Sequence, residues 1–168
     1  TKSLQAVTET NTHLWIATEK GDVYTYSKQG EEFIKEPSMS FVLEKDFRLK
    51  HLYPYEQNLL LVGENEIKIQ GKYSKKDCIG IAKSMYCQDS LCYLGGSIDA
   101  LIVNVKAQEA KPFLAEFNHT ILCVYPISQS KYWIGSRDGF FSYDTLDNTV
   151  RSLAYLHPAF AQTILYIE

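Results

Sequence analysis

Short stretches in which hydrophobic and polar residues alternate recur along the whole chain. Clear examples are residues 23–27, 66–70 and 100–105. Alternation with a period of two is typical of strands that are buried on one face. Turn-forming sequences such as KGD, KQGEE, SRDG and TLDN separate these stretches. The best candidate for a helix, residues 154–163, is interrupted by Pro158, so we predict an all-β chain.

One sequence phrase occurs several times along the chain. LWIATEKG at residues 14–21 and YWIGSRDG at residues 132–139 both contain Trp-Ile, then a small residue and a final Gly. Two weaker copies lie between them. The Trp positions of the complete copies and the corresponding positions of the weaker ones are Trp15, Leu61, Tyr93 and Trp133. Their spacings of 46, 32 and 40 residues predict a repeat of about 39 residues.

A repeat of this length with four short strands is typical of a β-propeller blade. We expect strands A to D of each blade to form an antiparallel meander. The expected blades span residues 1–40, 41–77, 78–117 and 118–160, and residues 161–168, which repeat part of the sequence at 119–126, would begin a further blade. An antiparallel sandwich, which also has glycine turns and alternating strands, is the alternative.

Four blades would form part of a larger propeller, with seven as the expected number of blades. An open arc of blades leaves a sheet face and strand edges unpaired. The expected structural partners are therefore further propeller chain or a second copy of this chain.

Each blade is expected to contain the same packing residue. The large residue at positions Trp15, Leu61, Tyr93 and Trp133 would lie on strand B and pack between neighbouring blades, where it buries the most area. The small residues two positions later are Ala17, Gly63, Gly95 and Gly135, and they would let strands approach closely. Gly21 and Gly139 are expected to supply the positive φ of a tight B–C turn.

Composition and charge exclude several classes of protein. The chain of 168 residues is 45% hydrophobic and carries a net charge of −3, which argues against a nucleic-acid binder. Its apolar runs are too short to cross a bilayer, and residues 1–7 do not resemble a signal peptide. We interpret the basic cluster at residues 71–76 as a solvated loop.

The cysteines and histidines show no metal-site spacing, so we expect neither a metal nor a cofactor. Cys87 and Cys92 flank the sequence QDSL. If QDSL is a hairpin loop, the two side chains could form a cross-strand disulfide, and buried thiols are the alternative.

The sequence YWIGSRDGFFSYD at residues 132–144 resembles the repeat of two-component regulator propellers, Leu-Trp-Ile-Gly-Thr-x-x-Gly-Leu-x-x-Tyr-Asp. Residues 14–27 resemble it too, with Ala17 for Gly and one extra residue before Tyr26. The two inner repeats lack the Trp, and the Gly-His and Trp-Asp pairs of WD40 repeats are missing.

This resemblance implies a function and a location. It implies the sensor region of a hybrid two-component regulator, periplasmic and part of an inner-membrane protein, with a kinase module elsewhere in the full-length protein. It also implies that the ligand is an oligosaccharide released by polysaccharide breakdown.

The chemistry that the sequence suggests is binding without catalysis. We find no His-Glu-x-x-His, Gly-x-Ser-x-Gly or Gly-x-Gly-x-x-Gly motif, and therefore expect no catalytic residues and no enzyme activity in this segment. A glycoside hydrolase with carboxylates from distant blades and a protein-interaction scaffold are the alternatives.

The expected binding face combines the B–C turns with the D–A connections, which share one edge of every blade. Polar and aromatic side chains on this edge suit sugar hydroxyls and rings. The candidate ligand-binding residues are Arg137, His119, Asn118, Asp138, His51, Tyr53 and Arg48, accompanied by Lys20, Asp22 and Asp99. Arg137 and His119 are the first choices, because Arg137 offers a fork of donors and His119 directly precedes a strand A.

Overall fold

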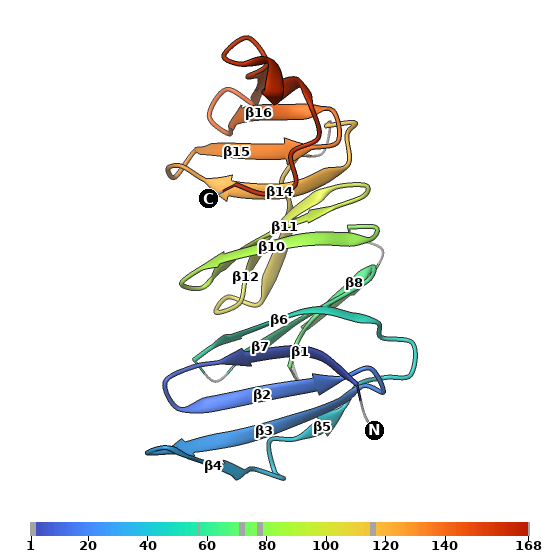
Figure 1. Ribbon diagram of the computed structural model, residues 1–168, viewed down its shortest axis with the longest axis vertical. Coiled ribbons are helices and arrows are strands. Elements are labelled where there is room, and N and C mark those ends of the chain that lie inside the picture. The colour runs from blue at the N-terminus through green and yellow to red at the C-terminus, as the bar shows by residue number, and fades with distance from the viewer. Residues whose placement is uncertain (1–2, 57, 71–72, 77–78, 115–116, 168) are drawn as a thin grey trace. The chain divides into compact units, whose positions relative to one another are not determined.

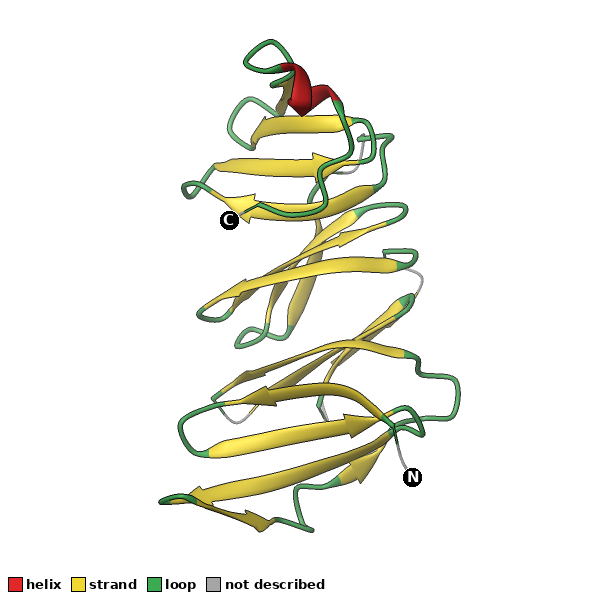
Figure 2. Cartoon of the chain, viewed as in Figure 1, coloured by secondary structure: helices red, strands yellow, loops and turns green. Residues whose placement is uncertain are grey.

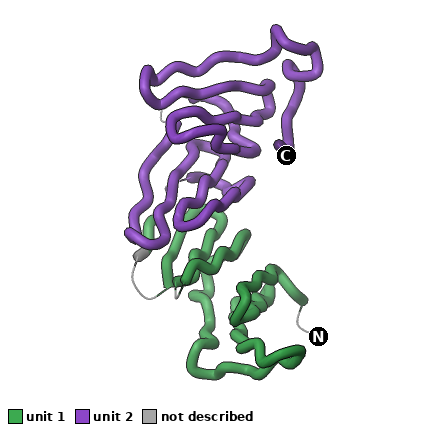
Figure 3. The backbone as a smooth tube through the Cα atoms, turned by 90° about the vertical axis from the view of Figure 1, so that its left-hand side faces the viewer, with its two compact units in different colours: residues 1–76 green, residues 77–168 purple. Residues whose placement is uncertain are grey.

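The computed structural model describes residues 1–168 except 1–2, 57, 71–72, 77–78, 115–116 and 168. Its strands form two compact units, residues 1–76 and 77–168 (Figure 3). Each unit contains two antiparallel sheets, and each sheet contains a meander of four consecutive strands (Figures 1 and 2). The predicted all-β class and the four meanders are confirmed.

The described residues of the first unit form nine strands. The first sheet comprises β1 (Leu4–Glu9), β2 (His13–Thr18), β3 (Asp22–Gln29), β4 (Glu32–Lys35) and the short β5 (Phe41–Val42). The second comprises β6 (Leu49–Tyr55), β7 (Asn58–Gly63), β8 (Glu66–Ile69) and β9 (Tyr73–Lys76). Because β5 pairs with β3, residues 41–42 belong to the first sheet, not to the second blade as expected. Residues 73–76 form a strand, so the interpretation of the basic cluster as a loop is wrong for them.

In the second unit, the part of the chain that the structure describes forms eight strands and one short 3₁₀ helix. The third sheet comprises β10 (Ala82–Gln88), β11 (Leu91–Gly96), β12 (Ala100–Asn104) and β13 (Glu109–Pro112). The fourth comprises β14 (Ile121–Pro126), β15 (Lys131–Ser136), β16 (Gly139–Asp144) and β17 (Thr149–Ser152), followed by η1 (Pro158–Ala161). Helix η1 begins at Pro158, the residue expected to interrupt a longer helix.

A bulge in the first strand sets the register of every sheet. The bulges lie at Leu4/Ala6, Leu49/His51, Ala82/Ser84 and Ile121/Cys123. Counted from these bulges, the residues equivalent to Trp15 are Leu60, Tyr93 and Trp133. All four expected packing residues lie on the second strand of their sheets, but Leu61 is one position away from the repeat position. Leu60 takes that position, and this corrects the alignment of the second repeat.

The core of each unit lies between its two sheets. In the first unit Trp15, 5% exposed, packs in one cluster with Leu52, Leu59 and Leu61 of the second sheet. Leu61 therefore faces Trp15 across the interface between the two sheets, and it is not the residue of the second sheet that is equivalent to Trp15. In the second unit, Tyr93 packs in a cluster with residues of the fourth sheet that include Tyr132. The repeat position thus faces the following sheet in both units.

Trp133 has a different environment. Its neighbours Tyr132 and Ile134 belong to the core shared with the third sheet, so alternation places Trp133 on the opposite face of β15. There its ring lies 6.3 Å from Tyr125 and 5.8 Å from Phe140, between ring centroids. Trp133 is only partly buried. No sheet that follows the fourth one is described, so the expectation that Trp133 packs between two blades stays a prediction.

Residues 162–167 contain no strand, but the contacts of Ile164 resemble those of Ile121 in the first strand of the fourth sheet. A Cβ at Gly95 of β11 would meet Ile121 of the next sheet, and a Cβ at Gly135 of β15 would meet Ile164 in the same way. The Ile164 N–H also donates to the Ser136 carbonyl at 2.9 Å. Ile164 therefore lies where a following strand A would lie, although a further blade at residues 161–168 stays a prediction.

Two glycines make the expected turns between the second and third strands. Gly21 has φ +87° and Gly139 has φ +134°, a region that L side chains rarely adopt. The prediction of positive φ at both positions is confirmed.

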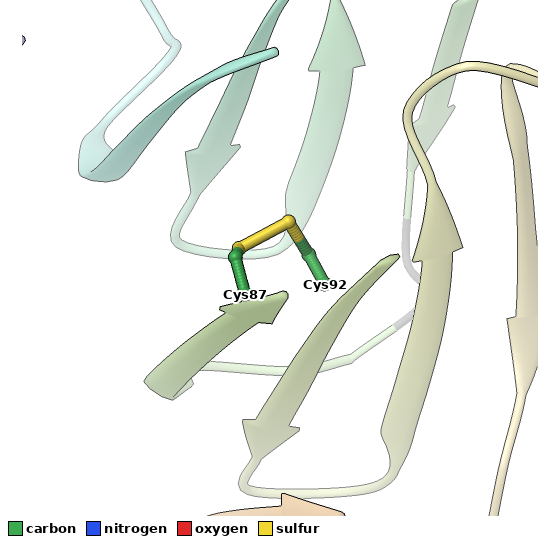
Figure 4. The surroundings of a disulfide bond; sticks show 2 residues. All are labelled: Cys87 and Cys92. Atoms are coloured by element: carbon green, nitrogen blue, oxygen red, sulfur yellow. A yellow bond between two sulfur atoms is a disulfide. The ribbon is translucent and has the colours of Figure 1, made fainter. Parts of the chain in front are cut away.

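A disulfide joins the first two strands of the third sheet (Figure 4). Cys87 of β10 and Cys92 of β11 are register partners with Cα atoms 4.1 Å apart. Of the two alternatives that the sequence left open, the structure contains the disulfide. Cys123 is a buried free thiol whose pKa is raised by burial, and Cys78 lies outside the described residues.

Candidate functional site

The turns between second and third strands lie at one edge of each sheet, together with the connections that lead to the next sheet. We call this the B–C edge, after the strand letters A to D within each sheet. The opposite edge, with the turns between first and second strands, is the A–B edge. Each unit contributes its own part of the B–C edge, and the two parts are described separately.

In the first unit the B–C edge contains a hollow of about 370 Å³, which we call the basic hollow. The turn after β2 and the connection between β5 and β6 provide most of its lining. The lining residues are Gln5, Thr18, Glu19, Lys20, Gly21, Leu43, Glu44, Lys45, Phe47, Arg48, Leu49 and Lys50. Four basic and two acidic side chains therefore surround it, and two of the basic ones, Lys20 and Arg48, are sequence-predicted site residues.

Backbone and side-chain bonds hold the walls of the basic hollow in place. The Leu43 N–H donates to the Gly21 carbonyl at 2.7 Å, which ties the connection to the turn after β2. The Phe47 N–H donates to the Glu44 carbonyl at 2.9 Å, and Gln5 Nε2 donates to the Leu49 carbonyl at 3.1 Å. Leu43, Phe47 and Leu49 are buried and give the hollow an apolar base. The charged side chains therefore stand on a fixed support.

The charges of the basic hollow are only partly neutralised. Glu44 pairs with Lys68 at 2.9 Å, and Arg48 lies 3.6 Å from Glu64. Burial lowers the pKa of Lys68, but its bonds with Glu44 and Glu66 outweigh this and raise the pKa overall, so Lys68 stays charged. Among the described residues, Lys20, Lys45 and Lys50 have no carboxylate partner. The hollow therefore has an excess of positive charge.

In the second unit the B–C edge carries a histidine–aspartate pair. His119 Nδ1 lies 2.8 Å from Asp138 Oδ2. The His119 ring stacks on Phe141 with centroids 5.6 Å apart, and Phe117 packs against it edge-on at 4.9 Å. These contacts fix the orientation of the imidazole although it is partly exposed. The structure thus brings together two of the predicted site residues.

Arg137 and Asn118 are exposed at the same edge of the second unit. The Arg137 backbone carbonyl accepts a hydrogen bond from Thr163 Oγ1 at 2.9 Å, which positions the turn. No ion pair of the Arg137 guanidinium is found among the described residues. The guanidinium is therefore available to a ligand.

Four other predicted residues belong neither to the basic hollow nor to the histidine–aspartate pair. His51 and Tyr53 lie within β6, not in the preceding connection, and do not line the basic hollow. Burial and the adjacent Lys50 lower the pKa of His51. Asp22 accepts a hydrogen bond from Thr18 Oγ1 at 3.4 Å, and Asp99 accepts one from the Ala100 N–H at 2.7 Å. These two carboxylates have local roles in their turns.

Sequence reasoning missed Lys45 and Lys50 of the basic hollow. The signal was present, because the sequence EKDFRLK at residues 44–50, which runs from the connection into the start of β6, contains three basic residues. Their separation by apolar and acidic residues hides the cluster in the sequence. Only the fold brings them beside Lys20, which comes from a turn far earlier in the chain.

No group of three or more described His, Cys, Asp or Glu side chains is placed to hold a metal ion. None of the helices within the described ranges has the length and apolar character needed to span a bilayer.

Comparisons with known proteins show similarity only at the level of structure. No protein-family model matches the chain, and no curated protein matches it. The structure of PorZ, a bacterial surface component of the type-IX secretion system of Porphyromonas gingivalis, is similar with a TM-score of 0.67 and 13% identity. The Neurospora crassa Pan2 WD40 domain has a TM-score of 0.60 and 14% identity. The extracellular domain of a putative hybrid two-component system from B. thetaiotaomicron has a TM-score of 0.57 and 14% identity.

These similarities show that the fold is that of β-propeller blades. They cover 90%, 89% and 89% of this chain but only 23%, 49% and 21% of PorZ, the Pan2 domain and the B. thetaiotaomicron domain. The chain therefore spans half or less of the length of these structures. Identities this low show the fold alone.

Proposed function

We propose that this chain is the ligand-sensing part of a bacterial two-component regulator that binds an oligosaccharide at the B–C edge without cleaving it. The observation that carries the proposal is the basic hollow, in which Lys20, Lys45, Arg48 and Lys50 surround an apolar base. Such a hollow can bind the carboxylates or sulfates of an acidic oligosaccharide through its charges, and the sugar rings through its apolar base. An acidic ligand is therefore favoured over a neutral one.

Two observations support an extracytoplasmic location for this sensor. The Cys87–Cys92 disulfide is a feature of proteins in oxidising compartments. Two structures of similar fold are described as a bacterial surface component and as an extracellular domain. Both agree with the expected place outside the inner membrane.

A protein-interaction scaffold is the second candidate. Ile98, Tyr155 and Leu156 belong to the B–C edge of the second unit and are 75%, 78% and 59% exposed. Large exposed apolar side chains at a propeller edge favour contact with another protein. The experiment below separates this function from the sensor.

The proposal is tested by calorimetric titration of the chain with a uronic-acid trisaccharide and a neutral trisaccharide, with mass-spectrometric analysis of the sugar afterwards. We expect saturable binding of the acidic sugar, which is recovered intact. Arg48→Ala should weaken binding about tenfold, because it removes a fork of donors from the basic hollow. Lys83→Ala, which removes an exposed charge from β10, is the matched control and should leave the affinity unchanged.

Three outcomes would contradict the sensor. Cleaved sugar would show an enzyme. Absence of binding to any sugar, with capture of a protein that depends on Tyr155, would favour the scaffold. An equal loss in Lys83→Ala and Arg48→Ala would show that the ligand responds to the overall charge of the chain, not to the basic hollow.

A further inference from the structure

A second hollow, of about 420 Å³, lies at the A–B edge of the second unit, between the third and fourth sheets. Gln88, Leu91 and Tyr93 contribute from the β10–β11 hairpin. Ile127, Gln129 and Tyr132 contribute from the β14–β15 hairpin. Among the residues that the structure describes, no Asp, Glu, Lys, Arg or His lines it. In this it differs from the basic hollow, which lies at the opposite edge of its sheets.

The floor of this neutral hollow consists of buried aromatic rings. Tyr93 and Tyr132 are 7% and 5% exposed, and their ring centroids lie 5.5 Å apart. Burial, with the neighbouring Tyr93 and Tyr143, raises the pKa of Tyr132 to about 12, so the phenol stays uncharged at any physiological pH. The Tyr132 hydroxyl donates to the Gln129 carbonyl at 3.3 Å and so supports the rim from below.

The rim of the neutral hollow carries two exposed carboxamides, those of Gln88 and Gln129. Neither side chain has a hydrogen-bond partner among the described residues, and each offers both donors and an acceptor. Leu91 is partly buried and Ile127 is 46% exposed, so both add apolar surface beside the amides. Amide and apolar groups therefore meet in one small hollow.

Both hairpins that provide the rim are held rigidly. The Cys87–Cys92 disulfide closes the first hairpin (Figure 4). Gln88 and Leu91 directly adjoin these two cysteines in the sequence. In the second hairpin the Ile127 N–H donates to the Lys131 carbonyl at 2.8 Å, and Ser128 Oγ accepts from the Lys131 N–H at 3.2 Å. A rim that is already ordered loses little entropy when a ligand binds.

We propose that the neutral hollow binds an uncharged sugar residue, with its hydroxyl groups on the Gln88 and Gln129 carboxamides and its C–H face against the apolar wall. A charged ligand would lose hydration here without an opposite charge to replace it. A peptide bound as an added strand needs free backbone groups at a strand edge. The turn groups of the β14–β15 hairpin already bond to one another. This inference does not depend on the proposed function, because the neutral hollow lies at the A–B edge and binds an uncharged ligand, whereas the proposed function concerns an acidic ligand at the B–C edge.

The test is a titration of the chain with cellobiose, maltose and lactose, followed by NMR of the glutamine side-chain amides and by calorimetry, with digalacturonate as the charged probe. We expect at least one neutral disaccharide to bind and to shift the Gln88 and Gln129 amides. Gln129→Ala should weaken this binding roughly tenfold. Gln162→Ala removes an exposed carboxamide at the opposite edge and should change it less than about twofold.

The same titration separates this site from the basic hollow. Neutral-sugar binding that survives Arg48→Ala but not Gln129→Ala supports the neutral hollow, whatever the acidic sugar does. Four results would overturn it: no neutral disaccharide binds, digalacturonate shifts the same amides equally, the loss follows Arg48→Ala, or an apolar peptide displaces the sugar from Gln129.

Discussion

Trp15 and Trp133 hold the same register position in their sheets but differ in their surroundings. Trp15 is enclosed by the core of the first unit, whereas Trp133 lies on a partly exposed face against Tyr125 and Phe140. We expect Trp15→Ala to lower the free energy of unfolding by about 3–5 kcal/mol, because it empties a buried site. Trp133→Ala should cost about 1–2 kcal/mol, since part of its ring is already in water.

Urea unfolding of both variants, followed by circular dichroism, measures this difference. A cost for Trp133→Ala as large as that for Trp15→Ala would show that the fourth sheet buries Trp133 in solution, by a second copy of the chain or otherwise. Repeating the measurement at several protein concentrations identifies the second copy.

His51 makes the free energy of unfolding depend on pH, and the direction of its pKa shift fixes the sign of that dependence. Burial and Lys50 lower its pKa in the folded state below the ordinary 6.5, so the unfolded chain binds a proton more readily. The contribution of neutral His51 to the free energy of unfolding is therefore fully present above about pH 6.5. It is lost as the pH falls through the pKa of His51 in the folded state, which lies below 6.5. His51→Gln should reduce the loss of stability between about pH 7.5 and pH 5.5. An unchanged pH dependence in this variant would contradict the assignment.

At the scale of elements, the disulfide ties together the two strands that form the β10–β11 hairpin. The loop that it closes is short, with a sequence separation of 5. Chain-entropy arguments give a loop of this size a stabilisation of about 2 kcal/mol. We expect the Cys87→Ser, Cys92→Ser double variant to lose about this amount in urea unfolding. Addition of a reductant to the unaltered chain is the control and should have the same effect, whereas no loss in either case would show that the thiols are unpaired.

The sequence predicted the elements well where its pattern was unambiguous. Alternation and the glycine turns located the meanders, and Gly21 and Gly139 have the expected φ. Alternation is absent in the apolar run Leu59–Val62, written LLLV, so the sequence could not tell Leu60 from Leu61. The bulge at Leu49/His51 decides this register, and a bulge leaves no clear mark in a single sequence.

The candidate site was predictable only in part, for a related reason. Turn residues such as Lys20 and Arg137 could be placed at the B–C edge from strand order alone. The extent of β6 and the path of residues 43–49 depend on tertiary bonds such as that between the Gln5 amide and the Leu49 carbonyl. In the folded chain His51 and Tyr53 lie within β6 and do not line the basic hollow, whereas Lys45 and Lys50 do.

At the scale of the whole molecule, the basic hollow and the neutral hollow differ in the charge of the side chains that line them. The chain is acidic overall, with a net charge of −3, yet the basic hollow carries an excess of positive charge. Binding of an acidic sugar there should weaken roughly five- to tenfold between about 0.05 M and 0.5 M NaCl, because salt screens exposed charges. Calorimetry at both salt concentrations checks this, and a neutral disaccharide is the control that should show no such dependence.

The central claim is that an acidic oligosaccharide binds in the basic hollow of the first unit. Backbone-amide NMR of the chain during titration with a uronic-acid trisaccharide tests it most directly. We predict saturable shifts at residues 18–21 and 43–50, the two segments that line the basic hollow. Shifts confined to other residues, or none at saturating sugar, would contradict the claim.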